Sequence, residues 1–231
     1  MVVLGIGASM FLLAKQAKRE GFSPDPWMDL VLWVAVTGFL GGRIFYVVQF
    51  WDDYSGDLLG VLRIWEGGVV FYGGVISALL FLGVYCRAKR ISFFKVTDLL
   101  VPYAFLTHAF GRIGCFLNGC CYGKICELPW AVKYPFLEFP VHPTQIYLSL
   151  FDLFGFIFLS WIYERRKYVG ETTFAYFLTY GTGRFLIEFL RGDHHTVAAG
   201  LTVSQLISIG FVGVVSLSYL LCWKRRREKV T

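Results

Sequence analysis

Charged residues are scarce in this chain. Only 16% of its 231 residues are charged, against about 25% in soluble domains. Hydrophobic residues make up 56% and the mean hydropathy is +0.58, a composition that indicates an integral membrane protein. The sequence also has no evident internal repeat and no low-complexity segment. These absences favour a single polytopic membrane domain that comprises residues 1–231.

The first apolar segment is a poor match to a signal peptide. The first apolar segment, residues 1–14, carries no basic n-region and no small-residue cleavage site. It is also shorter than the roughly 20 residues that a spanning helix requires. We therefore expect a first helix that is truncated at its N-terminus.

Seven apolar segments follow one another along the sequence, and they predict an all-α membrane protein with about seven transmembrane helices. The net charge of +6 does not point to nucleic acid, because fifteen basic residues cluster in alternate connections, where anionic lipids are the expected partner. The other connections hold only four basic residues, and the positive-inside rule places these connections outside the cytoplasm. Residues 118–143 then form an external loop or small periplasmic cap. The apolar segments are residues 1–14, 28–50, 69–86, 98–117, 144–163, 172–190 and 201–223.

Three arginines lie inside apolar segments, at positions 43, 112 and 184. A charge at bilayer depth costs at least a few kcal/mol and usually marks function. Because guanidinium groups recognise phosphate through two hydrogen bonds, Arg112 and Arg184 predict a site for a phospholipid headgroup. The alternative for Arg112 is that it reaches the headgroups from the end of its helix. His108, four residues earlier, is either a hydrogen-bonded core group or part of this site.

The segment that contains Arg184 presents more polar groups on the same helix face. Tyr180, Arg184 and Glu188 are spaced by four residues, and Arg191 lies close to that face. An ion pair between Arg184 and Glu188 that hides both charges from lipid is the simpler explanation. It does not account for the presence of an arginine in the segment.

Four cysteines, at 115, 120, 121 and 126, lie at the outer side. Their spacing is not a standard zinc pattern, and the C-x-x-C redox signature is absent. No metal and no cofactor are predicted. A disulfide that involves Cys126 is the expectation for an oxidising compartment, and a redox-active pair is the alternative.

Four motifs together resemble the prolipoprotein diacylglyceryl transferase family, in order and over nearly the whole chain. They are Trp65–Gly68 with Phe71–Gly74, the run Gly111–Gly119, the block His142–Tyr147, and the stretch Tyr180–Asp193. The resemblance implies a multi-pass enzyme of the bacterial inner membrane with its active site toward the periplasm. It implies transfer of diacylglycerol from phosphatidylglycerol to the lipobox cysteine of a preprolipoprotein signal peptide, with release of glycerol phosphate and without nucleic acid.

By this resemblance Arg112 is the lipid-binding arginine, and Gly123 belongs to the same block. The chain departs from the family at Tyr72, where a histidine is usual, and at Cys115 and Cys120, where asparagine and an acidic residue are usual. The expected catalytic residues are Arg184, Tyr180, Tyr72 and His108, with His108 as the substitute base. The expected phosphatidylglycerol-binding residues are Arg112, Asn118, Gly123, Glu188 and Arg191.

Two other functions remain open at the level of sequence. The cysteine cluster allows a membrane thiol–disulfide oxidoreductase. The substitutions at Tyr72 and Cys120 allow a homologue that binds lipid without catalysing transfer.

Overall fold

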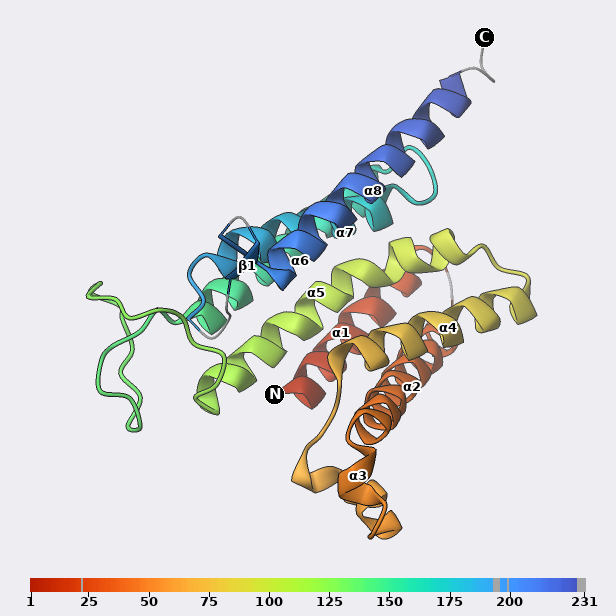
Figure 1. Cartoon of the computed structure of the whole chain (residues 1–231). Helices are drawn as coiled ribbons and strands as arrows, with labels where there is room; N and C mark the ends of the chain where they lie inside the picture. Colours follow the sequence, from red (N-terminus) through yellow and green to blue (C-terminus); the bar gives the residue numbers. More distant parts are fainter. Residues whose placement is uncertain (22, 193–195, 199, 228–231) are drawn as a thin grey trace. The chain divides into compact units, whose positions relative to one another are not determined.

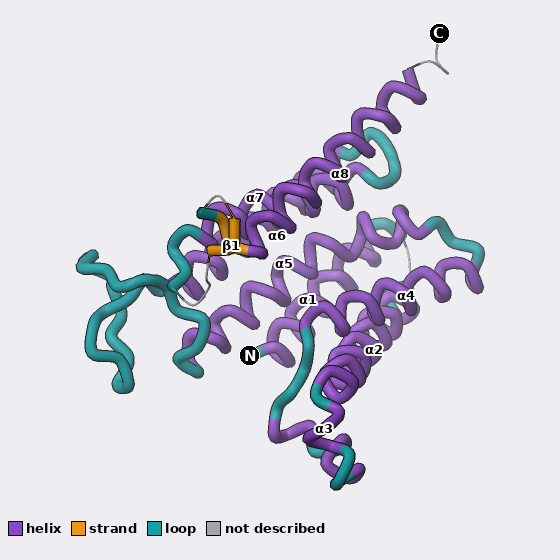
Figure 2. Tube along the Cα trace, viewed as in Figure 1, coloured by secondary structure: helices purple, strands orange, loops and turns teal. Residues whose placement is uncertain are grey.

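The protein is almost entirely helical (Figures 1 and 2). The computed structural model describes residues 1–21, 23–192, 196–198 and 200–227. The helices are α1 (Val2–Arg19), α2 (Asp25–Gln49), α3 (Trp51–Tyr54), α4 (Phe71–Lys89), α5 (Phe93–Leu117), α6 (Thr144–Arg165), α7 (Glu171–Glu188) and α8 (Val203–Arg227), with short 3₁₀ turns η1 (Leu58–Leu62) and η2 (Ile64–Glu66) and strands β1 (Thr196–Ala198) and β2 (Leu201–Thr202). Each of the seven predicted apolar segments therefore forms a helix.

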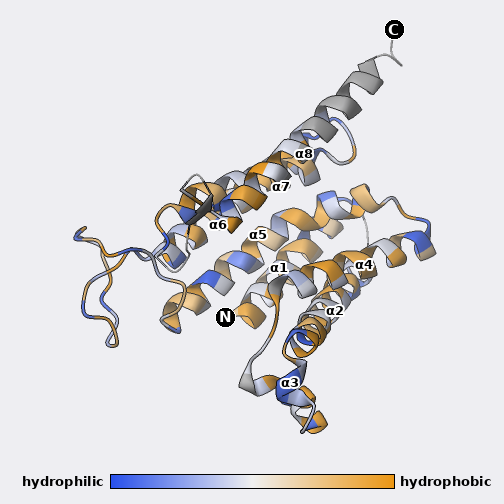
Figure 3. Cartoon of the chain, viewed as in Figure 1, coloured by the Kyte–Doolittle hydropathy of each residue, from blue (hydrophilic) through white to orange (hydrophobic). Residues whose placement is uncertain are grey.

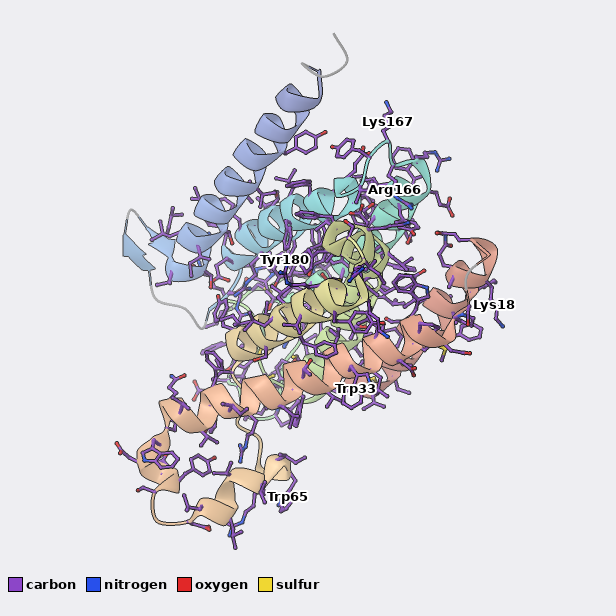
Figure 4. The ribbon with its side chains drawn as sticks, turned by 90° about the vertical axis from the view of Figure 1, so that its right-hand side faces the viewer. Lys18, Trp33, Trp65, Arg166, Lys167 and Tyr180 are labelled. Carbon is purple, nitrogen blue, oxygen red and sulfur yellow. The ribbon has the colours of Figure 1, made fainter. Side chains whose placement is uncertain are left out.

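Within the part of the chain that the structure describes, three helices are long and apolar enough to cross a membrane, namely α2, α5 and α6. Figure 3 shows apolar residues along most of the helical ribbon. Many large apolar side chains are exposed, such as Trp33 on α2 (Figure 4) at 56% and Ile157 on α6 at 66%. Exposed apolar surface of this extent is costly in water and is stable against lipid. The helical membrane class predicted from composition is confirmed.

The chain divides into two compact units. One contains Met10–Val96, and the other contains Met1–Ser9 with Thr97–Thr231. We call them the N-terminal unit and the C-terminal unit. Each is described by itself.

The N-terminal unit is built on close packing of α2 against α4. Glycines allow this approach: a Cβ on Gly42 would lie 2.5 Å from the side chain of Val69, and one on Gly74 would lie 2.9 Å from the carbonyl oxygen of Gly38. Small residues at helix contacts are the usual means of bringing two membrane helices together. The turn between η2 and α4 uses Gly67 and Gly68, both with positive φ, as expected from the paired glycines.

Arg43 of α2 has a structural role in this unit. Its guanidinium is buried and donates to backbone carbonyls of the α2–α4 connection, among them Gly67 at 2.6 Å, Gly60 at 3.0 Å and Val61 at 3.0 Å. It also lies over the ring of Tyr54, 5.4 Å from the centroid. The first of the three intramembrane arginines thus holds a loop in place.

The C-terminal unit contains the first turns of α1 together with α5 to α8. α6 packs on α7, and α7 packs on α8. A buried carboxylate, Asp98 on α5, accepts hydrogen bonds at the start of α7 from the backbone nitrogens of Gly170 at 2.6 Å and Thr173 at 2.8 Å. A negative charge at a helix N-terminus satisfies free N–H groups and the helix dipole. This contact fixes α7 against α5.

Candidate active site

α5 places His108 and Arg112 one helical turn apart. The Arg112 Nε donates a hydrogen bond to His108 Nε2 at 3.2 Å, and Arg112 Nη2 lies 3.1 Å from the same atom. Because arginine only donates hydrogen bonds, His108 Nε2 must be the acceptor. The proton of the neutral imidazole is then on Nδ1.

α6 supplies the group that receives this proton. Asp152 Oδ2 lies 2.7 Å from His108 Nδ1, and the side chain of Asp152 is only 1% exposed. The other oxygen, Oδ1, is buried and has no hydrogen-bond partner among the described residues. Asp152, His108 and Arg112 therefore form a hydrogen-bonded chain in which the carboxylate fixes the tautomer and the imidazole orients the guanidinium.

α7 contributes a second arginine with its own acid. Arg184 Nη2 lies 3.0 Å from Glu188 Oε2, the pair expected from their four-residue spacing. Glu188 is also held from β2, where the hydroxyl of Thr202 donates to Oε1 at 2.9 Å. Arg184 Nη1 is buried and finds no hydrogen-bond partner among the described residues. One donor of this guanidinium is thus available to a ligand.

Three guanidinium groups of the C-terminal unit, those of Arg112, Arg184 and Arg191, lie near one another. Arg112 and Arg191 both lie close enough to Arg184 to act on it electrostatically. Mutual repulsion of these guanidiniums in a poorly solvated site favours binding of an anion.

Tyr180, labelled in Figure 4, lies on α7 next to His108. Its ring stacks on Tyr176, with centroids 6.0 Å apart, and meets the edge of His108 at 5.9 Å. Aromatic contacts of this kind restrict the side chain to one orientation. The spacing argument that grouped Tyr180 with Arg184 and Glu188 agrees with this placement.

Gly123 connects the loop after α5 to the end of α7. Its N–H donates to the carbonyl of His142 at 2.9 Å, and it forms an antiparallel bridge with Arg191. A Cβ at Gly123 would lie 2.5 Å from the carbonyl oxygen of Leu190. A side chain therefore cannot be accommodated here, and the close approach holds the buried Arg191 next to the loop.

The cysteines do not form the expected disulfide. Cys126 is a free thiol, as are the other four cysteines whose side chains the structure describes. The sulfurs of Cys115, Cys120 and Cys121 lie within 4.8 Å of one another at the end of α5, and Cys126 does not belong to this group. Burial and the neighbouring Cys120 raise the pKa of the Cys121 thiol, while Arg191 and Arg112 oppose this effect.

The loop itself is tied to the start of α6. Gln145 is fully buried, and its side-chain nitrogen donates to the carbonyl of Cys120 at 2.6 Å and to the hydroxyl of Tyr134 at 3.2 Å. Burial raises the pKa of Tyr134, so this residue is a neutral phenol at physiological pH. Gln145, in the block His142–Tyr147 that opens the fifth apolar segment, thus holds the loop after α5 in place through hydrogen bonds.

The structure brings six of the nine residues predicted from sequence into one cluster: Arg112, His108, Tyr180, Arg184, Glu188 and Arg191. Gly123 supports the cluster from the loop, and Asn118 lies exposed in the turn after α5. Tyr72 belongs to the N-terminal unit, at the start of α4, and is 60% exposed. Asp193, the last residue of the fourth motif, lies outside the described residues.

Sequence reasoning missed Asp152. It lies within the apolar segment 144–163, so the same argument that singled out the three arginines applied to it as well. Its role became visible only when α6 and α5 were placed together.

Comparison with known proteins supports the resemblance. The family model described as prolipoprotein diacylglyceryl transferase matches residues 1–222. A phosphatidylglycerol–prolipoprotein diacylglyceryl transferase of Clostridium tetani is 37% identical over 214 residues, which cover 90% of this chain and 86% of that protein. The enzymes of the same name from Finegoldia magna and Thermotoga maritima are 36% and 37% identical and cover 92% and 94% of this chain, or 85% and 79% of their own length. The chain therefore belongs to the prolipoprotein diacylglyceryl transferase family.

Proposed function

We propose that this protein transfers the diacylglyceryl group of phosphatidylglycerol to the lipobox cysteine of a preprolipoprotein, forming a thioether and releasing glycerol phosphate. Family membership and the names of the relatives support the substrates and the reaction class. The observation that carries the proposal is the cluster of Arg112, Arg184 and Arg191, in which the buried Nη1 of Arg184 has no hydrogen-bond partner among the described residues. The phosphodiester of the headgroup carries a negative charge that guanidinium groups bind through paired hydrogen bonds.

The reaction makes one bond and breaks one. The sulfur of the lipobox cysteine attacks the glycerol carbon of the diacylglyceryl group, and the bond from that carbon to the phosphate oxygen breaks. A free thiol, with a pKa of about 8.5, is only partly ionised, and the field of the guanidiniums favours the thiolate. In this proposal the thiol proton passes to solvent before the attack.

The arginines act mainly on the leaving group. As the carbon–oxygen bond breaks, the phosphate gains a second negative charge. A guanidinium binds this dianion more strongly than the diester, so its stabilisation is greater in the transition state than in the bound substrate. We assign phosphate contacts to Arg184 Nη1, which has no partner among the described residues, and to Arg112.

His108 is better assigned as a positioning residue than as a general base. Its Nε2 lone pair already accepts from Arg112, and its Nδ1 faces Asp152. A tyrosine of pKa about 10 is a poor base at neutral pH. We therefore assign Tyr180 to hydrogen bonding with phosphate or ester oxygens.

The remaining residues support binding. Glu188 holds Arg184, and Gly123 holds Arg191 near the loop. Asn118, exposed in the turn after α5, offers a donor and an acceptor to the glycerol headgroup.

We further propose that the chain acts as one membrane domain in the bacterial inner membrane. The seven long helices α1, α2, α4, α5, α6, α7 and α8 then span the bilayer, and the basic connections lie in the cytoplasm. With this orientation the arginine cluster lies toward the periplasm, where the lipobox cysteine and phosphatidylglycerol of the outer leaflet meet.

The test uses the full chain in vesicles that contain phosphatidylglycerol, with a lipobox peptide as acceptor. Lipidation of the peptide and release of glycerol phosphate are measured together. Arg184→Ala and Arg112→Ala should abolish both, whereas Arg63→Ala, which removes an exposed arginine paired with Asp57, should leave both intact. Full activity of Arg184→Ala contradicts the proposal.

Two outcomes separate the other functions. Phosphatidylglycerol binding by the wild-type chain without release of glycerol phosphate indicates a non-catalytic lipid-binding homologue. Exchange of disulfides between the chain and a dithiol substrate indicates an oxidoreductase that uses the clustered thiols. Replacing Cys115, Cys120, Cys121 and Cys126 together by serine with lipidation intact excludes redox chemistry as the mechanism of transfer.

A further inference from the structure

Three thiols meet where the sequence spacing predicts no metal site. Cys115 lies in the last turn of α5, and Cys120 and Cys121 follow the turn after that helix. Their sulfurs all lie within 4.8 Å of one another. We propose that these three cysteines form a binding site for a thiophilic d¹⁰ cation, with Zn²⁺ as the ion they fit.

The distances suit a shared ion. Zinc–sulfur bonds of about 2.3 Å place the sulfurs of a tetrahedral or trigonal site roughly 3.8–4.0 Å apart. The sulfurs here lie within 4.8 Å, and those of Cys120 and Cys121 are 3.4 Å apart. Small rotations of the side chains are enough to reach the ligand geometry.

A disulfide between Cys120 and Cys121 fits this arrangement less well. Adjacent residues have Cα atoms about 3.8 Å apart across a trans peptide, whereas disulfides usually join Cα atoms about 4.4–6.8 Å apart. Cys120 and Cys121 are neighbours in the chain, and no peptide bond in the structure is cis. A metal ion uses all three sulfurs, and a disulfide leaves one of them out.

The backbone around the thiols is held in place without any ion. Fully buried Gln145 and Thr144 donate to the carbonyls of Cys120 at 2.6 Å and Cys121 at 2.9 Å. The N–H of Cys120 donates to the carbonyl of Cys115 at 3.2 Å, which closes the turn. Ligands fixed in this way lose little conformational freedom when they bind an ion.

Cys121 adopts a backbone conformation that few residues tolerate. Its φ is 64°, and Arg90 is the one other non-glycine residue with positive φ among the described residues. For a residue with a Cβ this left-handed conformation is sterically unfavourable. The two buried side chains of α6 maintain it, and it keeps the sulfur of Cys121 beside that of Cys120.

The charge of the surroundings also favours the site. Zn²⁺ bound by three thiolates leaves one negative charge, and the three thiol protons pass to solvent. Arg112 and Arg191 lie close enough to Cys121 to act on its charge. All three cysteines are only partly buried, so an ion can enter and water can take the fourth position.

The test measures ion binding alone and does not depend on lipid transfer. The full chain in detergent is reduced without oxygen, freed of metal with a chelator, and dialysed against Zn²⁺. We expect about one Zn²⁺ per chain, in line with a single three-thiolate site. Cys120→Ser and Cys121→Ser should each weaken binding roughly 100-fold or more, whereas Cys126→Ser, in the same loop, and Cys86→Ser, on α4, should bind as the wild type does.

A second measurement needs no variant. Co²⁺ bound in place of Zn²⁺ gives sulfur-to-metal charge-transfer absorption, whose strength reports the number of thiolate ligands. Three-thiolate absorption in the wild-type chain supports the site. Zinc well below one ion per chain, unchanged binding in Cys120→Ser, or cobalt absorption without thiolate character overturns it. Because no lipid substrate is present, a negative result here leaves the transferase proposal untouched, and the reverse also holds.

Discussion

Replacing Asp152 by asparagine tests the hydrogen-bonded chain that orients Arg112. The carboxylate lies 2.7 Å from His108 Nδ1 and is almost fully buried. Asparagine is nearly the same size, so packing in α6 is preserved while the negative charge is lost. The imidazole then loses the partner that favours its proton on Nδ1, and Arg112 loses a fixed acceptor.

The expected magnitude follows from the bond that is weakened. A hydrogen bond to a charged group contributes about 1.5–3 kcal/mol, and a neutral one about 0.5–1.5 kcal/mol. The difference of about 1–1.5 kcal/mol corresponds to a roughly 5- to 13-fold loss of kcat/KM if Arg112 acts on the transition state. Asp152→Ala leaves the N–H of the partly buried imidazole without its partner, and a loss of up to about 100-fold is expected.

The assay is lipidation of a lipobox peptide in vesicles with varied phosphatidylglycerol content, so that kcat and KM for the lipid are separated. Asp98→Asn is the matched control, because Asp98 is equally buried but holds the start of α7 instead of the arginine cluster. We expect Asp98→Asn to lower the thermal midpoint and to leave kcat per folded molecule unchanged. Asp152→Asn should lower kcat per folded molecule and leave the thermal midpoint unchanged.

A wild-type kcat/KM in Asp152→Asn would refute this reasoning. The same conclusion follows if Asp152→Asn and Asp98→Asn lower activity only in proportion to lost folded protein. In either case Asp152 would be a buried acid that stabilises α5 against α6 and has no part in orienting Arg112.

Further predictions concern three other positions. Arg184→Lys keeps the charge but loses the planar fork; we expect kcat/KM for phosphatidylglycerol transfer to fall roughly 10- to 100-fold, measured in the same vesicles, and equal activity would argue against phosphate contact. Arg43→Gln leaves several buried carbonyls of the α2–α4 connection without a donor; a loss of at least about 3 kcal/mol in the free energy of unfolding is expected, and an unchanged thermal midpoint contradicts the structural role. Gly123→Ala forces a Cβ against the carbonyl oxygen of Leu190; we expect about 1–3 kcal/mol of destabilisation by denaturant unfolding, while Gly7→Ala, in open space on α1, should have no such effect.

The helices of this protein could be predicted from the sequence because their signal is local. Long apolar stretches separated by basic connections determine helix number and position, and all seven segments appear as helices within a few residues of their predicted ends. The short elements α3, η1 and η2 between residues 51 and 66 were not predicted, because their shape depends on contacts with Arg43.

The candidate site was predictable where its residues share one helix. The four-residue spacing of Tyr180, Arg184 and Glu188, and of His108 and Arg112, placed each set on one face. The sequence joined Arg112 and Arg184 in one predicted phospholipid site, but it could not say how α5 and α7 present those faces to each other, because nothing local sets that contact. For the same reason Asp152, which approaches His108 from α6, was missed.

The sequence by itself thus determined that this is a helical membrane protein, where its helices lie, and which arginines occupy apolar segments. Hydrophobicity and helical periodicity are properties of the chain that need no partner. Only the tertiary structure decided what these arginines contact. Arg43 donates its hydrogen bonds to backbone carbonyls, whereas Nη1 of Arg184 has no hydrogen-bond partner among the described residues. The tertiary structure also brought Cys115 back to Cys120 and Cys121 through the turn that ends α5. Spacing along the chain did not reveal that cluster, because distance between side chains is set by how the chain folds back on itself.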